Sequence, residues 1–262
     1  MNIENLIKIA KDEDEKIFMK KIIDIFERVL EKGYVQLTNF LDPGQVYLLK
    51  YIAGIYKDIN LNISGGYTQA ERVRVALVPE ILAYIDTDFE IETLKIESNK
   101  FTRELKHRDL LGTILGCGVT REQIGDIILT EDNDAYIFVT KGIAQYLLEN
   151  TSRVGREHII IKKIDDLNIE ILKIKRDMKE ETIISTSLRM DNVISSAFGI
   201  SRTVAGELVE QGRVKLNHRL EGRKHKEMEA EDMISVRGYG RCRILKIKGE
   251  TKKGRRVIEI EK

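Results

Sequence analysis

The sequence predicts an α+β protein of several domains: a mostly helical N-terminal domain, a central α+β domain, and a C-terminal domain of two helices and a small sheet. The chain has 262 residues, which is long for one domain and suits two or three. Helical and strand-like patterns alternate through its middle. Positive charge is concentrated in its last third. We place the domains at residues 1–75, 76–175 and 182–262.

The first domain is predicted from two helical segments. Apolar residues recur at helical spacing from Phe18 to Leu30, and Gly33 ends that pattern. A second helix begins at Pro43, with Asp42 as its N-cap. A short strand, a turn at Gly65 and a strand near 73–78 follow, so residues 1–75 are expected to be mostly helical.

The central domain is predicted from strands that alternate with helices. The strand-like segments are 89–98, 134–140, 157–164 and 167–174, the helical ones are 104–118 and 141–152, and 120–129 is a short helix that enters a strand. Thr120 and Gln123 have the spacing of a capping box. This order indicates a compact α+β sheet domain, for which a ferredoxin-like arrangement is one candidate. The charged stretch 175–182 is expected to be a linker.

The C-terminal domain is predicted from two short helices followed by strands. Apolar residues from Leu188 to Phe198 form one helix face, and Gly199 ends that helix. Ser201 caps a second helix, which ends at Gly212. Strand-like stretches follow, so two helices and a small twisted sheet are expected to share one core.

Charge is distributed unevenly between the domains. Residues 182–262 contain 18 Lys and Arg against 11 Asp and Glu, a surplus of seven positive charges. The other 181 residues contain 26 against 32, and the whole chain has a formal charge of +1. A basic module on an acidic body indicates that the C-terminal domain binds a polyanion. The alternative is that net charge differs between the domains only because charge keeps the protein soluble.

Several classes of protein are not supported by the composition. No apolar run approaches the about 20 residues that cross a bilayer, and the acidic start does not resemble a secretory signal. The two cysteines, Cys117 and Cys242, are far apart and have no His or Cys at ligand spacing. We therefore expect a cytoplasmic protein with no metal site, no cofactor and no membrane partner.

The second C-terminal helix carries positive charge where its dipole disfavours it. Arg202 lies in the first turn, although cations are favoured at the end of a helix. Ser201 and the free N–H groups at this helix end can hold a phosphate, and Arg202 adds a charged donor. Arg213 and Lys215 follow Gly212 and are expected to project from the same edge. The alternative is that these cations lie on a solvent-exposed face without a ligand and that Ser201 only caps the helix.

Three further residues belong to the same prediction. Arg189, at the start of the first helix, is expected to join the phosphate site, and Asp191 is expected to orient it. Asn217 follows a strand, where it either binds nucleic acid or forms a turn.

The end of the chain extends the basic surface. Its cations are Arg237, Arg241, Arg243, Lys252, Lys253, Arg255 and Arg256. Gly238 and Gly240 flank Tyr239 and permit a tight turn that approaches phosphates closely; a charged hairpin without a ligand is the alternative. Phe198 is expected in the core, so recognition of RNA shape and backbone is expected instead of base stacking.

Catalytic motifs are not found. The HIGH and KMSKS signatures of tyrosyl-tRNA synthetases and the GRLD-type sequence of pseudouridine synthases do not occur, and SGGY does not form a glycine-rich cofactor loop. His107, Arg108 and Asp109 form the polar cluster of the central segment, where capping or surface roles are favoured over catalysis. We therefore expect no catalytic residues and no enzyme.

Residues Leu188 to Val236 resemble the S4 RNA-binding domain. The stretches that carry this resemblance are LRMDNVI, GISRTVAGELVEQGRVKLN and MEAEDMISV. In such domains two helices and the following turn form a basic surface that holds RNA backbone. The resemblance implies that Arg189, Ser201, Arg202, Arg213, Lys215, Asn217, Arg237, Arg241 and Arg243 lie on or near that surface.

Nearly the whole chain resembles the YlmH family of bacterial S4-domain proteins. The stretches that carry this resemblance are LTNFLDPGQ, HRDLLGTILGCGVTREQIGDIIL, YIFVTKGIAQYLLENTSRVG and RGYGR. The family implies a non-enzymatic factor that binds ribosomal RNA and tRNA on the large ribosomal subunit, in quality control of stalled ribosomes, with genes near cell-division genes. It also implies RNA binding by the central domain.

Two functional hypotheses follow. The first is a three-domain RNA-binding protein that docks through its S4 module. The second is an adaptor in cell division whose acidic N-terminal and central domains bind protein partners, with incidental RNA binding. For the central domain, the cations that we select as RNA contacts are Arg103, Lys106, Arg108 and Arg121.

Overall fold

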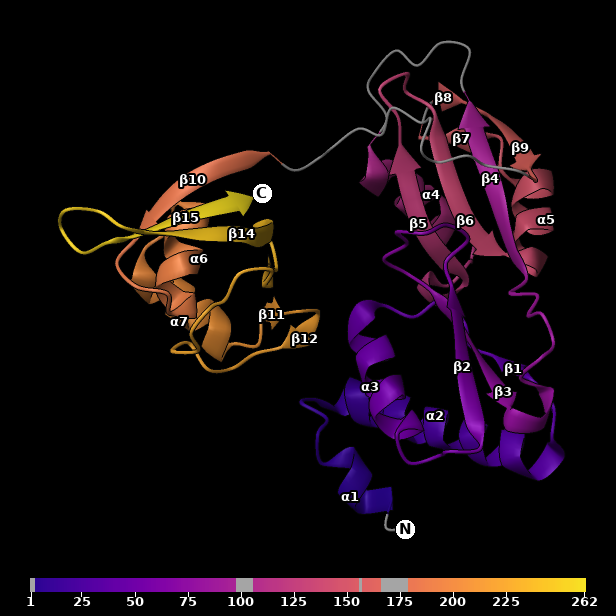
Figure 1. Ribbon diagram of the computed structural model, residues 1–262. Coiled ribbons are helices and arrows are strands. Elements are labelled where there is room, and N and C mark those ends of the chain that lie inside the picture. The colour runs from indigo at the N-terminus through magenta and orange to yellow at the C-terminus, as the bar shows by residue number, and fades with distance from the viewer. Residues whose placement is uncertain (1–2, 98–105, 156, 166–178) are drawn as a thin grey trace. The chain divides into compact units, whose positions relative to one another are not determined.

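The computed structural model describes residues 3–97, 106–155, 157–165 and 179–262 (Figure 1). The chain divides into two compact units. One unit is Phe18–Lys175, and the other combines Met1–Ile17 with Arg176–Lys262. Within the described residues, none of the helices has the length and apolar character needed to cross a membrane.

The first part of the Phe18–Lys175 unit is an α+β layer. Its elements are α2 (Glu13–Lys32, in this unit from Phe18), β1 (Gln36–Leu37), α3 (Pro43–Ala53), β2 (Ile59–Ser64), β3 (Arg74–Pro79) and η1 (Glu80–Leu82). The strands form an antiparallel sheet in the order β1-β3-β2. Asp42 caps α3 as predicted, because its Oδ1 accepts from the N–H of Gln45 at 2.9 Å.

The first domain is mostly helical up to residue 75, as predicted, but its predicted boundary needs correction. Helices α2 and α3 hold most of its regular structure, and the strand predicted near 73–78 is β3, the buried central strand of a three-stranded sheet. The boundary predicted between residues 75 and 76 falls inside β3, which pairs with β2 along its whole length. Strand pairing depends on residues distant in sequence, which a local pattern does not reveal.

The second part of this unit is a four-stranded antiparallel sheet with two helices. Its elements are β4 (Ile91–Glu97), α4 (His107–Gly116), η2 (Arg121–Gln123), β5 (Ile124–Leu129), β6 (Ala135–Thr140), α5 (Lys141–Asn150), β7 (Arg153–Val154), β8 (Glu157–His158) and β9 (Ile160–Ile164). The strand order β5-β6-β4-β9 and the βαββαβ sequence match the ferredoxin-like arrangement. The predicted strand 167–174 and Arg103 lie outside the described residues.

The two parts of this unit are joined through Arg72 and Asp126. The carboxylate of Asp126 accepts from the hydroxyl of Tyr67 at 2.8 Å and from the N–H of Arg72 at 3.1 Å. The Arg72 guanidinium donates to the carbonyl oxygens of Phe40 and Ile124. These partners come from both parts, and the two parts belong to one compact unit of the fold.

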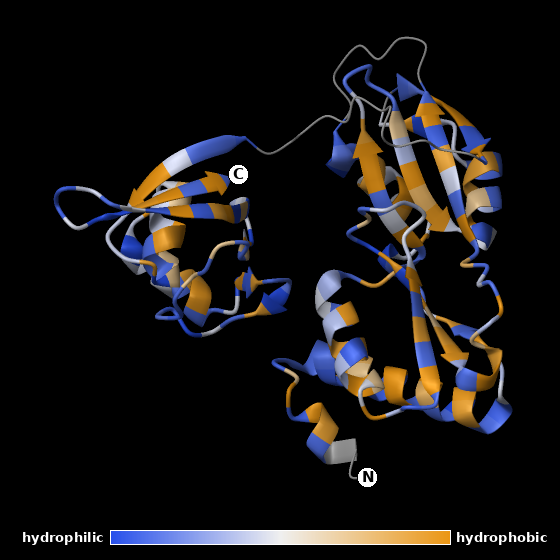
Figure 2. Ribbon diagram, viewed as in Figure 1, coloured by the Kyte–Doolittle hydropathy of each residue, from blue (hydrophilic) through white to orange (hydrophobic). Residues whose placement is uncertain are grey.

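The C-terminal unit packs α6 and α7 against a six-stranded antiparallel sheet and also includes α1 and the start of α2. Its elements are α1 (Ile3–Ile7), β10 (Glu180–Ser185), α6 (Met190–Phe198), α7 (Arg202–Glu210), β11 (Val214–Leu216), β12 (Arg219–Leu220), β13 (Met233–Val236), β14 (Gly240–Glu250) and β15 (Arg256–Glu261). The order is β10-β15-β14-β13-β11-β12. Val193 and Leu208 of the helices share one core with Ile234 and Ile258 of the sheet. Figure 2 shows that the connection between β14 and β15 is hydrophilic.

The limits of this unit differ from the prediction at both ends. β10 begins at Glu180 and pairs with β15, so residues 180–185 belong to the sheet, whereas the sequence predicts a linker over 175–182. The first 17 residues belong to this unit and not to the predicted 1–75 domain. Arg219 donates to Glu15 at 2.8 and 2.9 Å, and such an ion pair between distant segments leaves no local sequence signal.

Candidate nucleic-acid interface

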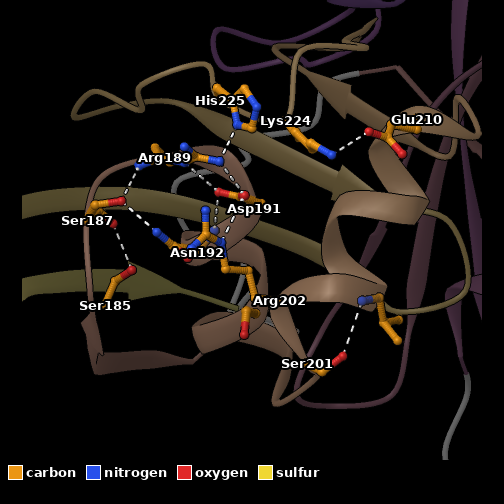
Figure 3. A network of polar contacts seen from close by, with 12 residues as sticks. Ser185, Ser187, Arg189, Asp191, Asn192, Ser201, Arg202, Glu210, Lys224 and His225 are labelled. Carbon is orange, nitrogen blue, oxygen red and sulfur yellow. Dashed lines mark hydrogen bonds and ion pairs between the residues drawn. The ribbon is translucent and has the colours of Figure 1, made fainter.

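Two arginines meet one carboxylate where α6 and α7 begin. Arg189 is the N-cap of α6, and Arg202 is the first residue of α7. Arg189 donates from Nε to Oδ1 of Asp191 at 3.1 Å and from Nη2 to Oδ2 at 2.7 Å. Arg202 donates from Nε to Oδ2 at 3.1 Å, so Asp191 lies between the two guanidinium groups (Figure 3). We call Arg189, Asp191 and Arg202 the arginine clamp.

The arginine clamp presents net positive charge to solvent. The Asp191 side chain is 4% exposed, whereas those of Arg189 and Arg202 are 31% and 55% exposed. Burial raises the pKa of Asp191, but hydrogen bonds and charge from both arginines outweigh burial, so its pKa lies below the ordinary value. The carboxylate is therefore ionised at neutral pH and neutralises one of two positive charges. The orientation of Arg189 by Asp191 is confirmed.

A distant loop completes the surroundings of the arginine clamp. The N–H of Asp191 donates to the carbonyl of Lys224 at 3.1 Å, and this pairing brings His225 against Arg189. Lys224 forms an ion pair with Glu210 at 2.6 Å. A shallow depression of about 610 Å³ lies here, lined by Arg189, Asp191, Arg202, Thr203, Gly206, Glu207, Glu210, Lys224 and His225. No sequence signal pointed to Lys224 and His225, because an irregular loop positions them.

The start of α7 has the geometry of an anion site. Ser201 is its N-cap, and the hydroxyl accepts from the N–H of Val204 at 3.2 Å, which confirms the predicted cap. The N–H groups of Arg202 and Thr203 have no partner inside the helix, because the first N–H groups of any helix point out of its end. Backbone donors and the guanidinium of Arg202 therefore lie together at this helix end.

Arg213 and Arg237 form a second cationic pair, at the ends of β11 and β13. Arg213 follows Gly212, whose φ of +67° turns the chain out of α7. The N–H of Arg237 donates to the carbonyl of Arg213 at 2.9 Å, and Nη2 of Arg213 donates to the carbonyl of Arg237 at 3.1 Å. Both residues are exposed, and the Arg213 guanidinium lies against the backbone of Arg237.

Lys215, Arg241 and Arg243 are not on the helix side of the domain. Lys215 lies between the buried residues Val214 and Leu216, which pack in the core with α6 and α7, so its side chain points to the other face of the sheet. Arg241 and Arg243 flank buried Cys242 in the same way, and Arg243 is ion-paired with Glu231. The prediction that Lys215 projects from the edge of Arg202 is wrong, because the strand register sets its face.

Asn217 has a structural role in a turn. Its φ is +49°, and its Nδ2 donates to Oδ1 of Asp232 at 2.8 Å. Its Oδ1 accepts from the N–H of Met233 at 2.9 Å. Both polar atoms of the side-chain amide are therefore engaged within the protein. The sequence left open whether Asn217 binds nucleic acid or forms a turn, and the structure shows that it forms a turn.

The central-domain candidates differ in what their side chains contact. Arg121 donates from Nη1 to the carbonyls of Ile124 and Gly125, at 2.7 and 3.2 Å, so it fixes backbone. Arg108 has an 80% exposed side chain at the start of α4, and Lys106 is exposed beside it. Of the candidates, Lys106 and Arg108 are therefore the cations directed to solvent.

Clusters that hold metal ions do not occur in the part of the chain that the structure describes. There, no group of three or more His, Cys, Asp or Glu side chains has the arrangement to bind an ion. His107, from the polar cluster of the sequence, is the first residue of α4.

Comparison with known proteins covers almost the whole chain. Residues 14–81 match the family model "YlmH, N-terminal", and residues 85–168 match "Putative RNA-binding domain in YlmH". The ribosome-associated protein quality control protein P2 of Bacillus subtilis is 32% identical over 251 residues, which are 95% of each chain. The structure of the cell division protein ylmH from Streptococcus pneumoniae is 26% identical, with a TM-score of 0.50 over 58% of this chain and 92% of that one. The chain belongs to the YlmH family.

Proposed function

We propose that this chain is a non-enzymatic RNA-binding factor whose C-terminal unit is an S4-type module. In this proposal the module docks on structured ribosomal RNA and tRNA at the large ribosomal subunit, in quality control of stalled ribosomes in the cytoplasm. The observation that carries the proposal is the arginine clamp at the open start of α7. The relative from Bacillus subtilis is named as a ribosome-associated quality control protein, which supports the same assignment.

The chemistry of the clamp suits a phosphate backbone. Arginine presents planar donors that match phosphate oxygens, and Asp191 holds two such groups in fixed orientations. Because the guanidinium groups are already ordered, less side-chain entropy is lost on binding. Backbone N–H groups at the α7 start add donors of fixed direction. We assign phosphate contacts to Arg189, Ser201, Arg202, Arg213 and Arg237.

The matched central domain supplies a second RNA contact in this proposal. Its family model is described as RNA-binding, and Lys106 and Arg108 are its solvent-directed candidates. Strands β4 and β9 give it little free charge: Lys95 pairs with Glu97 and Asp134, and Lys163 pairs with Glu92. We therefore give the central domain an auxiliary role and the C-terminal unit the main one.

The test is co-sedimentation of the purified chain with large ribosomal subunits. The test variant is Arg189→Ala/Arg202→Ala, and the matched control is Arg28→Ala/Lys32→Ala, which removes two positive charges from exposed positions of α2. Wild type and control are expected to sediment with large subunits at moderate salt, whereas the test variant remains in the supernatant.

Two outcomes would contradict the proposal. If the test variant sediments as well as wild type, the arginine clamp is not the docking surface. If wild type sediments with neither subunit, ribosome docking itself is wrong. The adaptor hypothesis, with protein partners on the acidic domains, then becomes the better one; a structural relative is named as a cell division protein.

A further inference from the structure

Tyr239 is an exposed aromatic residue at the tip of a tight hairpin. Val236 of β13 pairs with Gly240 of β14, so the connecting loop has only three residues. Gly238 and Gly240 have φ of +90° and +118°, which side chains with a Cβ rarely adopt. The N–H of Tyr239 donates to the carbonyl of Val236 at 3.0 Å, and the residue is 44% exposed. The backbone therefore holds an aromatic ring out to solvent.

The ring rests on a second aromatic residue. Phe198, the last residue of α6, lies 6.2 Å from Tyr239 between ring centroids, at 65° between planes. This edge-to-face geometry is favourable for aromatic pairs. Phe198 packs against the core but is only partly buried, although the sequence predicts it to be a core residue. It therefore supports Tyr239 and fixes the direction of its ring.

Two exposed arginines belong to or contact the loop that carries this ring. Arg237 precedes Gly238 in the same loop and is exposed, with no side-chain partner among the described residues. Arg213 is bonded to the Arg237 carbonyl through one nitrogen, which leaves further donors of its guanidinium for a ligand. A Cβ built at Gly238 would lie 3.4 Å from Nη2 of Arg213, so this guanidinium lies against the loop.

We infer that Tyr239 is a stacking platform for one unpaired RNA base, with Arg213 and Arg237 binding the adjoining phosphates. The inference rests on the proposed RNA-binding function and deepens it. Proteins that bind single-stranded RNA combine aromatic platforms with cations along the backbone, and both features meet at this hairpin tip. Backbone recognition alone, as expected from the sequence, requires no exposed aromatic ring. The module thus selects RNA that presents an extruded base.

The experiment compares two synthetic RNAs, a stem-loop with one bulged adenosine and the same stem-loop without it. Binding to the full chain is measured for wild type, Tyr239→Phe, Tyr239→Leu and Arg189→Ala/Arg202→Ala. We expect wild type and Tyr239→Phe to prefer the bulged RNA by about tenfold, a typical contribution of one stacked base. Tyr239→Leu loses this preference, and the double variant weakens binding to both RNAs.

The outcomes separate the two proposals. If Tyr239→Leu keeps the preference, or wild type shows none, the stacking platform is wrong even when RNA binding is retained. If the double variant binds both RNAs as tightly as wild type, the proposed docking surface is wrong. A second measurement does not depend on folding of a variant: 2-aminopurine at the bulge loses fluorescence when it stacks. Unchanged fluorescence on binding of wild type overturns the inference.

Discussion

At residue scale, Asp191 fixes the direction of two cations with one buried carboxylate. Asp191→Ala removes the shared acceptor from a position that is 4% exposed and leaves Arg189 and Arg202 to repel each other. Hydrogen bonds to charged groups contribute about 1.5–3 kcal/mol. Because both arginines are partly exposed and become hydrated, we expect a loss of about 1–2 kcal/mol in free energy of unfolding. Urea unfolding measures this loss.

RNA binding by Asp191→Ala is the sharper measurement. The variant gains one net positive charge, so simple attraction to RNA predicts tighter binding. The arginine clamp predicts weaker binding, because the two guanidinium groups lose their fixed orientation. Asp191→Asn is the control, since it keeps an acceptor of the same shape but not the charge. Tighter binding by both variants would show that charge, and not orientation, determines affinity.

A second prediction at this scale concerns pH and Glu221. Hydrogen bonds from Arg223 lower the pKa of this glutamate to about 2, against the opposing effect of burial and with help from the charge of Lys11. Its pKa is thus lower in the folded than in the unfolded chain, where the ordinary value is 4.5. The stabilisation is fully present above pH 4.5 and is lost as the pH falls towards 2.

The measurement is urea unfolding of wild type and Glu221→Gln between about pH 6 and about pH 2.5, a range that spans most of the predicted loss. Arg223 is 71% exposed, so solvent screening reduces the expected difference to about 1–2 kcal/mol at the upper end of this range. The difference should shrink as the pH falls. A difference that is independent of pH would mean that the substitution changes packing and that ionisation of the glutamate contributes nothing.

At element scale, a substitution at the start of α7 is expected to change folding stability and RNA affinity in different directions. Ser201→Asp keeps a side-chain oxygen that caps the helix, and its negative charge favours the positive helix end. The free energy of unfolding is therefore expected to stay equal or to rise by up to about 1 kcal/mol. RNA affinity is expected to fall about tenfold, since the carboxylate occupies the phosphate position. Filter binding and thermal unfolding measure the two effects.

Ser201→Ala is the comparison for this variant. It removes the cap without adding charge, at a typical loss of about 1 kcal/mol, and it leaves the backbone donors open to phosphate. Affinity should therefore change much less than for Ser201→Asp. Equal affinity of Ser201→Asp and wild type would exclude the α7 start as a phosphate site.

The elements that sequence predicts well are those with local signals. Asp42, Ser201 and Gly199 mark helix ends through capping chemistry and left-handed backbone, and the structure has each of them at a helix end. β10 lacks such a signal, because EETIIS begins with charged residues and pairs with β15, more than 70 residues later. The central position of β3 depends in the same way on pairing with β1 and β2.

The candidate site also contains some features that local sequence predicts and others that depend on residues distant in sequence. The contact between Arg189 and Asp191 spans two residues and follows from sequence. The face of Lys215 depends on which residues of β11 enter the core, and the ring of Tyr239 depends on Phe198, which is 41 positions away. Tertiary packing sets both the face of Lys215 and the position of the Tyr239 ring. For this reason the sequence pattern wrongly placed Lys215 beside Arg202 and did not predict an aromatic platform.

At the scale of the whole molecule, the basic segment of the sequence nearly coincides with one of the two compact units. The surplus of seven positive charges lies in residues 182–262, and this segment belongs to the unit that contains both cationic pairs. The Phe18–Lys175 unit contains 21 Lys and Arg against 24 Asp and Glu, and salt bridges occupy lysines of its strands β4 and β9. Electrostatic attraction to RNA therefore originates mainly in the C-terminal unit, and the salt dependence of binding reports chiefly on that unit.

The final prediction uses this salt dependence to decide which face of the C-terminal unit meets RNA. Each phosphate that a cation neutralises contributes about −0.7 to −0.9 to the slope of log K against log salt concentration. Arg202→Ala removes a cation from the helix side and should reduce the slope by about one contact. Lys215→Ala removes one from the opposite face of the sheet, and a rigid RNA stem on the helix side does not reach it. The slope for Lys215→Ala should therefore equal that of wild type. A reduced slope for Lys215→Ala, together with an unchanged slope for Arg202→Ala, would place the RNA on the outer face of the sheet.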